Sequence, residues 1–328
     1  MIPYVASVAT EGVIFAILTL GLNVIWGWAG DFDIAYYGYV AIGVYMALVT
    51  SIGRVPPPDV YILGWQLPFV AAVLVAMASA ALVSLCIGAV ALRKLRASYY
   101  AITTLSAVLV LQIVIGNYTP LFNGYNGLYG MSQPFNEWLH LSPEAYPLFF
   151  LGLCTAVLAL VYFSLERLSN GPFGLALRSV REEEKAAAAF GRNIFALKFR
   201  AYVLGATIGG LGGALFAAYL GAFNPSAWSP IETLLLYAAM FVGGSGNSRG
   251  VILGVFLVSV LFQEVTRFIP SIGGNASVGP AVRQIMIGFL ILGFLRYRVQ
   301  GLLPEPRSKD ALMERTATEA YARGSAAD

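Results

Sequence analysis

Residues 21–47, GLNVIWGWAGDFDIAYYGYVAIGVYMA, join two apolar stretches through a glycine-rich break that carries the carboxylates Asp31 and Asp33. Glycine allows the backbone to leave the helical conformation at such a break. An ionisable side chain deep in a membrane costs at least ~2.5 kcal/mol, so it is normally paired, hydrated or near an interface. The stretch therefore predicts two apolar segments separated by a polar break that needs water or a partner.

The composition of the whole chain indicates a membrane protein. Of the 328 residues, 58% are hydrophobic and 11% are charged, against about 45–50% and about 25% in soluble domains. Runs of about 20 apolar residues can cross a bilayer, and in lipid they must form helices that satisfy their own backbone. We predict an all-α polytopic integral membrane protein with about 8–10 transmembrane helices. The expected spans are 8–26, 33–52, 67–91, 99–118, 146–165, 200–221, 231–244, 250–268 and 280–296.

Several functional classes are disfavoured by the residues that the chain lacks. Cys86 and Cys154 fall inside apolar spans, where free thiols behave as small hydrophobes, and His140 is the only histidine. We therefore expect no metal site, and no converging catalytic set indicates an enzyme. No lysine follows glycine in a phosphate-loop pattern, so the chain cannot hydrolyse ATP alone. No basic region precedes the first apolar run, so we expect no cleaved signal peptide.

Basic residues gather in alternate connections between the spans, as expected if these connections all lie on one face of the membrane. These connections hold 17 of the 20 lysines and arginines, and the exceptions are Arg54, Arg267 and Arg283. By the positive-inside tendency this face is cytoplasmic and includes the C-terminus. The first 52 residues then cross either twice, with the N-terminus outside, or once with a re-entrant or broken element. We favour two crossings.

The connection 166–199 is the longest polar segment on the basic face. Asn170, Gly171 and Pro172 are typical of a helix start, strong helix formers run from Arg178 to Phe190, and Gly191 is a natural stop. Arg178 and Glu182 stand at a spacing that allows a pair on one helix face. A solvated surface loop is the ordinary interpretation of such a segment, but the alanine run before Phe190 would give the helix a smooth side that fits another protein.

Residues 171–193, GPFGLALRSVREEEKAAAAFGRN, resemble the cytoplasmic loop of the branched-chain amino acid ABC transporter permeases of the LivM type. The resemblance implies that this loop is a coupling helix that docks on an ATP-hydrolysing subunit. The residues that match the family pattern are Arg178, Arg181, Glu182, Glu184, Ala187 and Gly191.

Further blocks extend the resemblance over roughly residues 10–295. The stretch 21–47 matches the first block of the family, and NGYNGLYGM, residues 123–131, matches a later one. The opening block also departs from the family, since Asp31 and Asp33 stand where Gln and Ser are usual and Tyr36 stands where His is usual. The break is therefore either a turn at the cytoplasmic interface or part of a broken helix that lines the translocation path.

Polar residues within or near the spans are candidates for the pathway or its gate. The outer loop 119–147 is rich in aromatic residues and is either an interfacial belt or, by resemblance, part of the gate beneath a binding protein. The candidates for pathway or gate are Asn23, Asp31, Asp33, Tyr36, Thr104, Ser106, Gln112 and Asn126. Gly205, Gly209 and Gly213 recur at intervals of four, and we assign them to helix packing within the bundle or at a permease dimer interface.

The resemblance implies the permease subunit of an ATP-driven ABC importer in the bacterial inner membrane, for branched-chain or other small amino acids and related small polar solutes. The implied partners are a second LivH-like permease subunit, two ABC ATPase subunits that use ATP and Mg, a periplasmic or extracytoplasmic substrate-binding protein, and membrane lipid, but no nucleic acid. The alternative is an ion-coupled secondary transporter, with Glu11, Glu232 and Glu264 as its candidate coupling groups. We expect residues 1–300 to form the permease domain, with 166–199 as its coupling loop, and residues 301–328 to form a flexible cytoplasmic tail.

Overall fold

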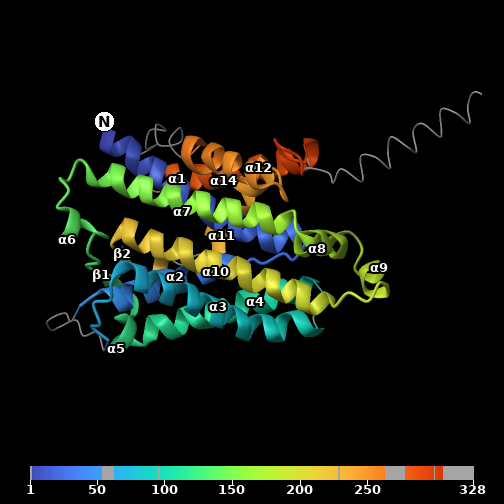
Figure 1. Cartoon of the computed structure of the whole chain (residues 1–328), viewed down its shortest axis with the longest axis horizontal. Helices are drawn as coiled ribbons and strands as arrows, with labels where there is room; N and C mark the ends of the chain where they lie inside the picture. The colour runs from blue at the N-terminus through green and yellow to red at the C-terminus, as the bar shows by residue number, and fades with distance from the viewer. Residues whose placement is uncertain are drawn as a thin grey trace, which may run out of the picture.

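A computed structural model of the chain describes residues 2–53, 63–94, 97–227, 230–262, 278–298 and 300–305. The described part is a bundle of helices that run roughly along one common axis (Figure 1). The long helical elements are α1 (Ile2–Asn23) with the π-helix η1 (Val24–Trp28), α2 (Tyr36–Ser51), α3 (Phe69–Lys94), α4 (Ala97–Asn117), α7 (Tyr146–Ser169), α8 (Pro172–Glu182), α10 (Ile194–Leu220), α11 (Pro230–Gly243), α12 (Ser248–Val255) with the π-helix η4 (Phe256–Phe262), and α14 (Val278–Tyr297).

Short elements lie in the connections. They are α5 (Thr119–Phe122), the 3-10 helix η2 (Gly124–Asn126), α6 (Asn136–Leu139), α9 (Glu184–Ala189), the 3-10 helix η3 (Pro225–Ala227), and the strands β1 (Leu128–Tyr129) and β2 (Ala222–Phe223). The two strands pair antiparallel, with Leu128 opposite Phe223. This pairing ties the loop after α4 to the segment that follows α10.

The predicted all-α membrane architecture is confirmed, and a helix lies at each of the nine predicted spans. Five described helices are each long and apolar enough to cross a membrane, and a sixth span results if the bent pair of α11 and α12 is counted as one. That pair bends by 119° at the turn between its halves. The stretch 231–244 is therefore one half of a broken element, in keeping with its short length. Residues 263–268 of the next predicted span, with Glu264 and Arg267, lie outside the described residues, as does Arg54.

The two ends of the bundle differ in character. At one end lie α8 and α9, while α5, β1 and α6 lie at the other (Figure 1). Arg93 at the end of α3 stacks on Phe195 at the start of α10, and Glu305 beyond α14 pairs with Arg178 of α8. These contacts bring the three main basic connections to a single end. We call it the basic end, and the opposite end the loop end.

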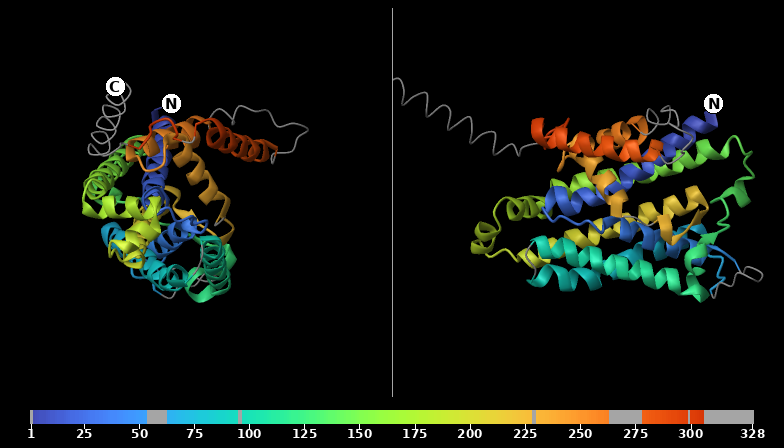
Figure 2. Two further views of the ribbon diagram at one scale, coloured as in Figure 1. Left: turned by 90° about the vertical axis from the view of Figure 1, so that its right-hand side faces the viewer. Right: turned by 180° about the vertical axis from the view of Figure 1, so that it is seen from behind.

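α10 lies against α1, α2 and α3, and small residues bring their backbones together. A Cβ on Gly205 would meet the carbonyl oxygen of Gly21 in α1 at 2.7 Å, and a Cβ on Gly213 would meet that of Val40 in α2 at 2.3 Å. A Cβ on Gly209 would meet the Tyr36 hydroxyl at 3.3 Å. All three glycines of the ladder therefore face other helices of this chain. α3 and α4 lie on one side of the bundle, and α14 lies on the other (Figure 2).

The packing of α10 generates a stability prediction. Gly213→Ala places a methyl group against the backbone of Val40, and overpacking of this kind typically destabilises by about 1–3 kcal/mol. We expect a lower midpoint of thermal unfolding for the purified protein. Gly152→Ala in α7 is the matched control, because no atom lies within 4 Å of its Cβ position and alanine is the better helix former by about 1 kcal/mol. Equal midpoints for the two variants would contradict this account of the packing.

Candidate functional site

The polar segment at the basic end begins with an amphipathic helix. Pro172 opens α8, and Leu177 and Val180 are fully buried on its inner side. A Cβ on Gly174 would meet the Ser169 carbonyl oxygen at 2.2 Å, so glycine lets α8 pack closely against the end of α7. Half-buried arginines flank this apolar side. α8 is therefore seated firmly on the bundle with its charged groups directed at neighbouring elements.

The structure corrects the prediction of one helix that starts at Asn170–Pro172 and continues to Phe190. The chain is extended at Glu183, with φ −151° and ψ 98°, and this residue separates α8 from α9. Glutamates at the C-terminal end of α8 interact unfavourably with the helix dipole, whereas Glu184 at the first position of α9 interacts favourably. The break therefore places Glu184 at a helix start, where its charge is favourable, instead of in the interior of a continuous helix.

A single carboxylate holds both arginines of α8. Glu305 Oε1 lies 2.7 Å from Arg178 Nε, and Glu305 Oε2 lies 2.6 Å from Arg181 Nη2. Arg178 also donates to the Ser169 hydroxyl at 2.6 Å, so it does not form the suggested pair with Glu182. Arg181 donates a second hydrogen bond to the carbonyl oxygen of Gly27. The α8 arginines thus join α7, the end of η1 and the segment after α14.

The segment that carries Glu305 is itself fixed to the bundle. We call residues 300–305 the strap. Leu302 N donates to Val242 O at 2.9 Å and Leu303 N donates to Gly243 O at 3.0 Å, while Asn247 Nδ2 donates to Pro304 O at 3.0 Å. The strap therefore links α8 to the turn between α11 and α12. Residues 306–328, the rest of the expected tail, lie outside the described residues.

A second ion-pair network joins α9 to the polar break. Lys198 Nζ in α10 donates to Asp31 Oδ1 at 2.7 Å and to Glu184 Oε1 at 2.5 Å. Burial raises the pKa of Asp31 above its ordinary value, and the charge of Lys198 opposes that rise. Both Lys198 and Asp31 are largely buried, so the lysine connects the coupling segment to the interior of the bundle.

Residues 29–35 run from the basic end into the bundle, and we call them the re-entrant segment. The Asp33 backbone N donates to the Tyr237 hydroxyl at 3.0 Å, and Tyr37 N donates to Thr233 Oγ1 at 3.1 Å. The Tyr36 hydroxyl donates to Leu18 O at 2.8 Å, beside the middle of α1. α2 therefore begins deep in the bundle, while Asp31 stays near the basic end. The segment is therefore an irregular break that enters the bundle from the basic end.

The candidate pathway residues occupy different depths. Asn23 is buried, and its Oδ1 accepts from Gly246 N at 2.8 Å, so it ties α1 to the turn between α11 and α12. Thr104 is buried on α4 and its hydroxyl donates to Ala101 O at 3.1 Å, whereas Ser106 on the same helix is exposed. Gln112 Nε2 donates to Pro225 O at 2.8 Å near the loop end. Asn126 is exposed in η2. Thr104 lies beside the candidate Asp33, whereas the other residues do not converge on one point.

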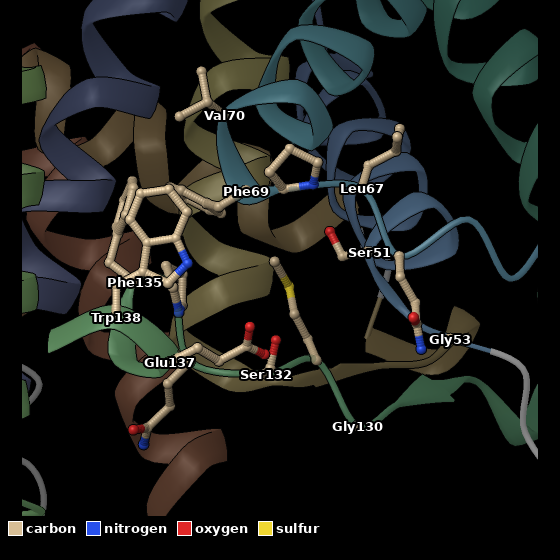
Figure 3. A pocket seen from close by; sticks show the side chains of 15 residues that line it. Ser51, Gly53, Leu67, Phe69, Val70, Gly130, Ser132, Phe135, Glu137 and Trp138 are labelled. Atoms are coloured by element: carbon tan, nitrogen blue, oxygen red, sulfur yellow. The ribbon is translucent and has the colours of Figure 1, made fainter. Parts of the chain in front are cut away.

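A hollow lies at the loop end (Figure 3). It has a volume of about 660 Å³ and lies between the end of α2, the start of α3 and the segment around α6. Phe135 and Trp138 line one side, with the carboxylate of Glu137 next to them, and Ser51 lies on the opposite side (Figure 3). Phe135 is also packed against Phe69 of α3, with ring centroids 5.9 Å apart.

Sequence reasoning missed Glu305, Lys198, Tyr100 and Tyr237. Asp31 had a usable signal, because a carboxylate beside an apolar stretch needs a partner, but in sequence Lys198 counts with the basic connection 166–199 and is not paired with it. Glu305 lies in a short polar stretch with no periodicity, and its partners are more than 120 positions away in sequence. No group of three or more His, Cys, Asp or Glu that would suit a metal ion occurs in the described ranges.

A helical bundle with a polar re-entrant segment and an anchored amphipathic helix at one end defines a multi-pass membrane permease. The chain belongs to the family described as "Branched-chain amino acid transport system / permease component", whose model matches residues 4–295. The recognition made from the sequence motifs is confirmed. The chain is an ABC-type transport subunit and not an enzyme, and family membership removes the ion-coupled alternative.

Relatives in other organisms carry matching descriptions. The chain is 32% identical over 230 residues to a probable branched-chain amino acid transport permease protein LivM of Methanocaldococcus jannaschii, covering 67% of this chain and 66% of that protein. It is 29% identical over 323 residues to the high-affinity branched-chain amino acid transport system permease protein LivM of Escherichia coli, covering 92% and 70%. A nucleoside ABC transporter permease protein NupC of Lactococcus lactis is 33% identical over 142 residues, covering 43% and 40%. The chain thus spans about two thirds of the length of the first two relatives, and no solved structure matches it.

The strap generates a prediction about local opening. Glu305→Gln removes both ion pairs with α8, each of which is partly exposed and stabilises by about 0–1 kcal/mol. The amides of Leu302 and Leu303 bond to α11 carbonyls, so we expect their hydrogen exchange to accelerate, by up to roughly tenfold. Glu182→Gln is the matched control, because Glu182 is an exposed carboxylate on α8 that forms no ion pair with the strap. Unchanged exchange in the Glu305 variant would show that the strap is held by its backbone bonds alone.

Proposed function

We propose that this chain is the permease subunit of an ATP-driven importer. It would move branched-chain or other small amino acids, and related small polar solutes, that a soluble binding protein delivers. The family match over residues 4–295 and the names of the relatives support this substrate class. The importer would contain a second permease subunit and two ATPase subunits, and those subunits would hold ATP and Mg.

The basic end would face the cytoplasm of a bacterial inner membrane. The positive-inside tendency supports this orientation, because the main basic connections meet at this end. The strap and the C-terminus would then also be cytoplasmic. The N-terminus lies at the loop end with α6 (Figure 1), so α1 would begin outside. The hollow at the loop end would face the binding protein, next to Asn126 and the aromatic residues of the outer loop.

The observation that carries the proposal is the way in which α8 and α9 are built. α8 is packed on the bundle by buried Leu177 and Val180 and held by Glu305. In contrast, α9 projects from the bundle and is followed by Phe190, which is 86% exposed. A firmly anchored helix followed by an exposed apolar tip suits docking to another protein. Its occupant would be the nucleotide-binding subunit of the importer.

The contacts of α8 and α9 suggest how a movement at the ATPase would reach the interior. Closure of the ATPase dimer would pull the paired coupling segments together. Arg181 bonds to Gly27 at the end of η1, and Lys198 joins Glu184 to Asp31. Both links end on the re-entrant segment or just before it. A shift of α8 and α9 would therefore displace this segment and α10, and the bundle would alternate between outward and inward openings.

Phe190→Ala tests the docking role. We expect ATP-dependent uptake by the assembled complex in proteoliposomes to fall by roughly tenfold or more, since a buried aromatic anchor commonly contributes about 2 kcal/mol or more to an interface. The uptake assay uses radiolabelled leucine and its loaded binding protein. Phe163→Ala is the matched control, because Phe163 is also an exposed aromatic residue, at 68%, but belongs to α7 and not to the α9 tip. Wild-type uptake in the Phe190 variant would contradict docking at this tip.

A further inference from the structure

Asp33 is a fully buried carboxylate whose hydrogen-bonding capacity is only partly used. Its side chain is 0% exposed. Oδ1 accepts from Ala35 N at 3.0 Å, whereas Oδ2 is buried and has no hydrogen-bond partner. Among the described residues, no lysine or arginine forms an ion pair with it. A carboxylate in this environment lacks the cation that usually compensates such a group.

Hydroxyl-bearing side chains of other helices lie near Asp33. On α11, the Tyr237 hydroxyl bonds to the Asp33 backbone N and O. On α4, Thr104 lies beside the Asp33 carboxylate, and Tyr100, one turn earlier, is within electrostatic range of it. The Tyr100 hydroxyl is likewise buried without a hydrogen-bond partner. The Tyr202 hydroxyl of α10 is already bonded to that of Tyr39. Two buried polar atoms without hydrogen-bond partners, Asp33 Oδ2 and the Tyr100 hydroxyl, therefore belong to the re-entrant segment and to α4, which lies against it.

Residues of α4 and α11 lie together beside Ile34 and Ala35 of the re-entrant segment. A hollow of only about 10 Å³ is lined there by Ile34, Ala35, Gly38, Val108 and Thr233, among others. A Cβ on Gly38 would meet Val108 at 2.2 Å, so α4 closes tightly over the start of α2. The opposite face of α4 is largely exposed within this chain. α4 is therefore the helix whose displacement opens Asp33 at the least loss of packing.

We propose that Asp33, with the hydroxyls of Thr104 and Tyr100, is the internal recognition site for the ammonium group of an amino acid in transit. The inference rests on the proposed import function and specifies the chemistry of its pathway. An ammonium group supplies the missing cation and donors for both Oδ2 and the phenol oxygen. The apolar lining of the gap, Leu105, Val108 and Leu109, suits an aliphatic side chain. The present structure is the closed state, in which α4 covers the site.

The first test measures leucine uptake by the complete complex in proteoliposomes with a leucine-loaded binding protein. Asp33→Asn removes the charge and keeps the shape, and we expect a fall of roughly 10- to 100-fold, the usual effect of losing a hydrogen bond to a charged group. Asp33→Glu keeps the charge and retains most of the uptake. Stimulation of ATP hydrolysis by the loaded binding protein persists in both. Thr50→Val is the control, because that buried hydroxyl bonds only to the backbone of its own helix.

The outcomes separate this inference from the proposed function. Wild-type uptake in Asp33→Asn, or an equal loss in Asp33→Asn and Asp33→Glu, overturns the recognition role and leaves the importer proposal intact. Failure of the wild-type complex to import leucine with ATP instead contradicts the proposed function. Loss of binding-protein stimulation in Asp33→Asn indicates a structural role for the carboxylate and also overturns the inference.

Chemical modification gives a second test, whose result a purely structural role of Asp33 would not change. Thr104→Cys is made with Cys86 and Cys154, the free cysteines of the described chain, changed to Ser. During turnover we expect cationic 2-aminoethyl methanethiosulfonate to react faster than its neutral methyl analogue, with leucine slowing both. Addition of Asp33→Asn removes the preference for the cation. Equal rates with Asp33 intact, or no modification during turnover, contradict the proposed site.

Discussion

Direct backbone contact between α10 and its neighbours is the constraint on which the bundle depends. A Cβ on Gly210 would meet the carbonyl oxygen of Ala76 in α3 at 2.7 Å, and a Cβ on Gly43 in α2 would meet that of Gly210 at 2.6 Å. Lipid tails are as apolar as leucine, so burial of apolar surface does not by itself select helix partners in a membrane. Small residues do select helix partners, because only they allow two helix backbones to approach this closely. These contacts therefore fix the positions of α1, α2 and α3 around α10.

This packing accounts for the re-entrant segment. The Tyr36 hydroxyl bonds to carbonyl oxygens of Leu18 and Gly205, which fixes the start of α2 deep between α1 and α10. The chain leaves η1 at Trp28, near the basic end, and must reach that depth without a helix. Irregular backbone at membrane depth persists only where protein supplies its hydrogen bonds. Tyr237 and Thr233 of α11 supply them here, so the broken α11–α12 element and the re-entrant segment support each other.

The sequence was informative where the physical signal is local and uninformative where the signal is long-range. Apolar run length located the spans, and the spacing of Gly205, Gly209 and Gly213 indicated a packing face, because both patterns are written in neighbouring residues. The packing partners of that face cannot be found in neighbouring residues, since nothing in the spacing shows that Gly213 meets Val40. The pair of Lys198 and Asp31 is 167 positions apart, and that of Arg181 and Glu305 is 124 positions apart. The break at Glu183 was missed because propensity favours one helix there, whereas tertiary ion pairs favour two.

The ion pairs at the basic end and the backbone contacts along α10 differ in how easily they can change. Ion pairs that remain partly exposed contribute about 0–1 kcal/mol each, so the links from Glu305 to α8 and from Lys198 to Glu184 can exchange partners at small cost. The backbone contacts of α10 cannot change without losing packing along whole helices. A displacement that starts at α8 and α9 is therefore expected to move α10 with α1, α2 and α3 as one body and to rearrange the ion pairs around it. α4, which has fewer close contacts with that body, is the element left to move relative to it, and it is the helix that covers Asp33.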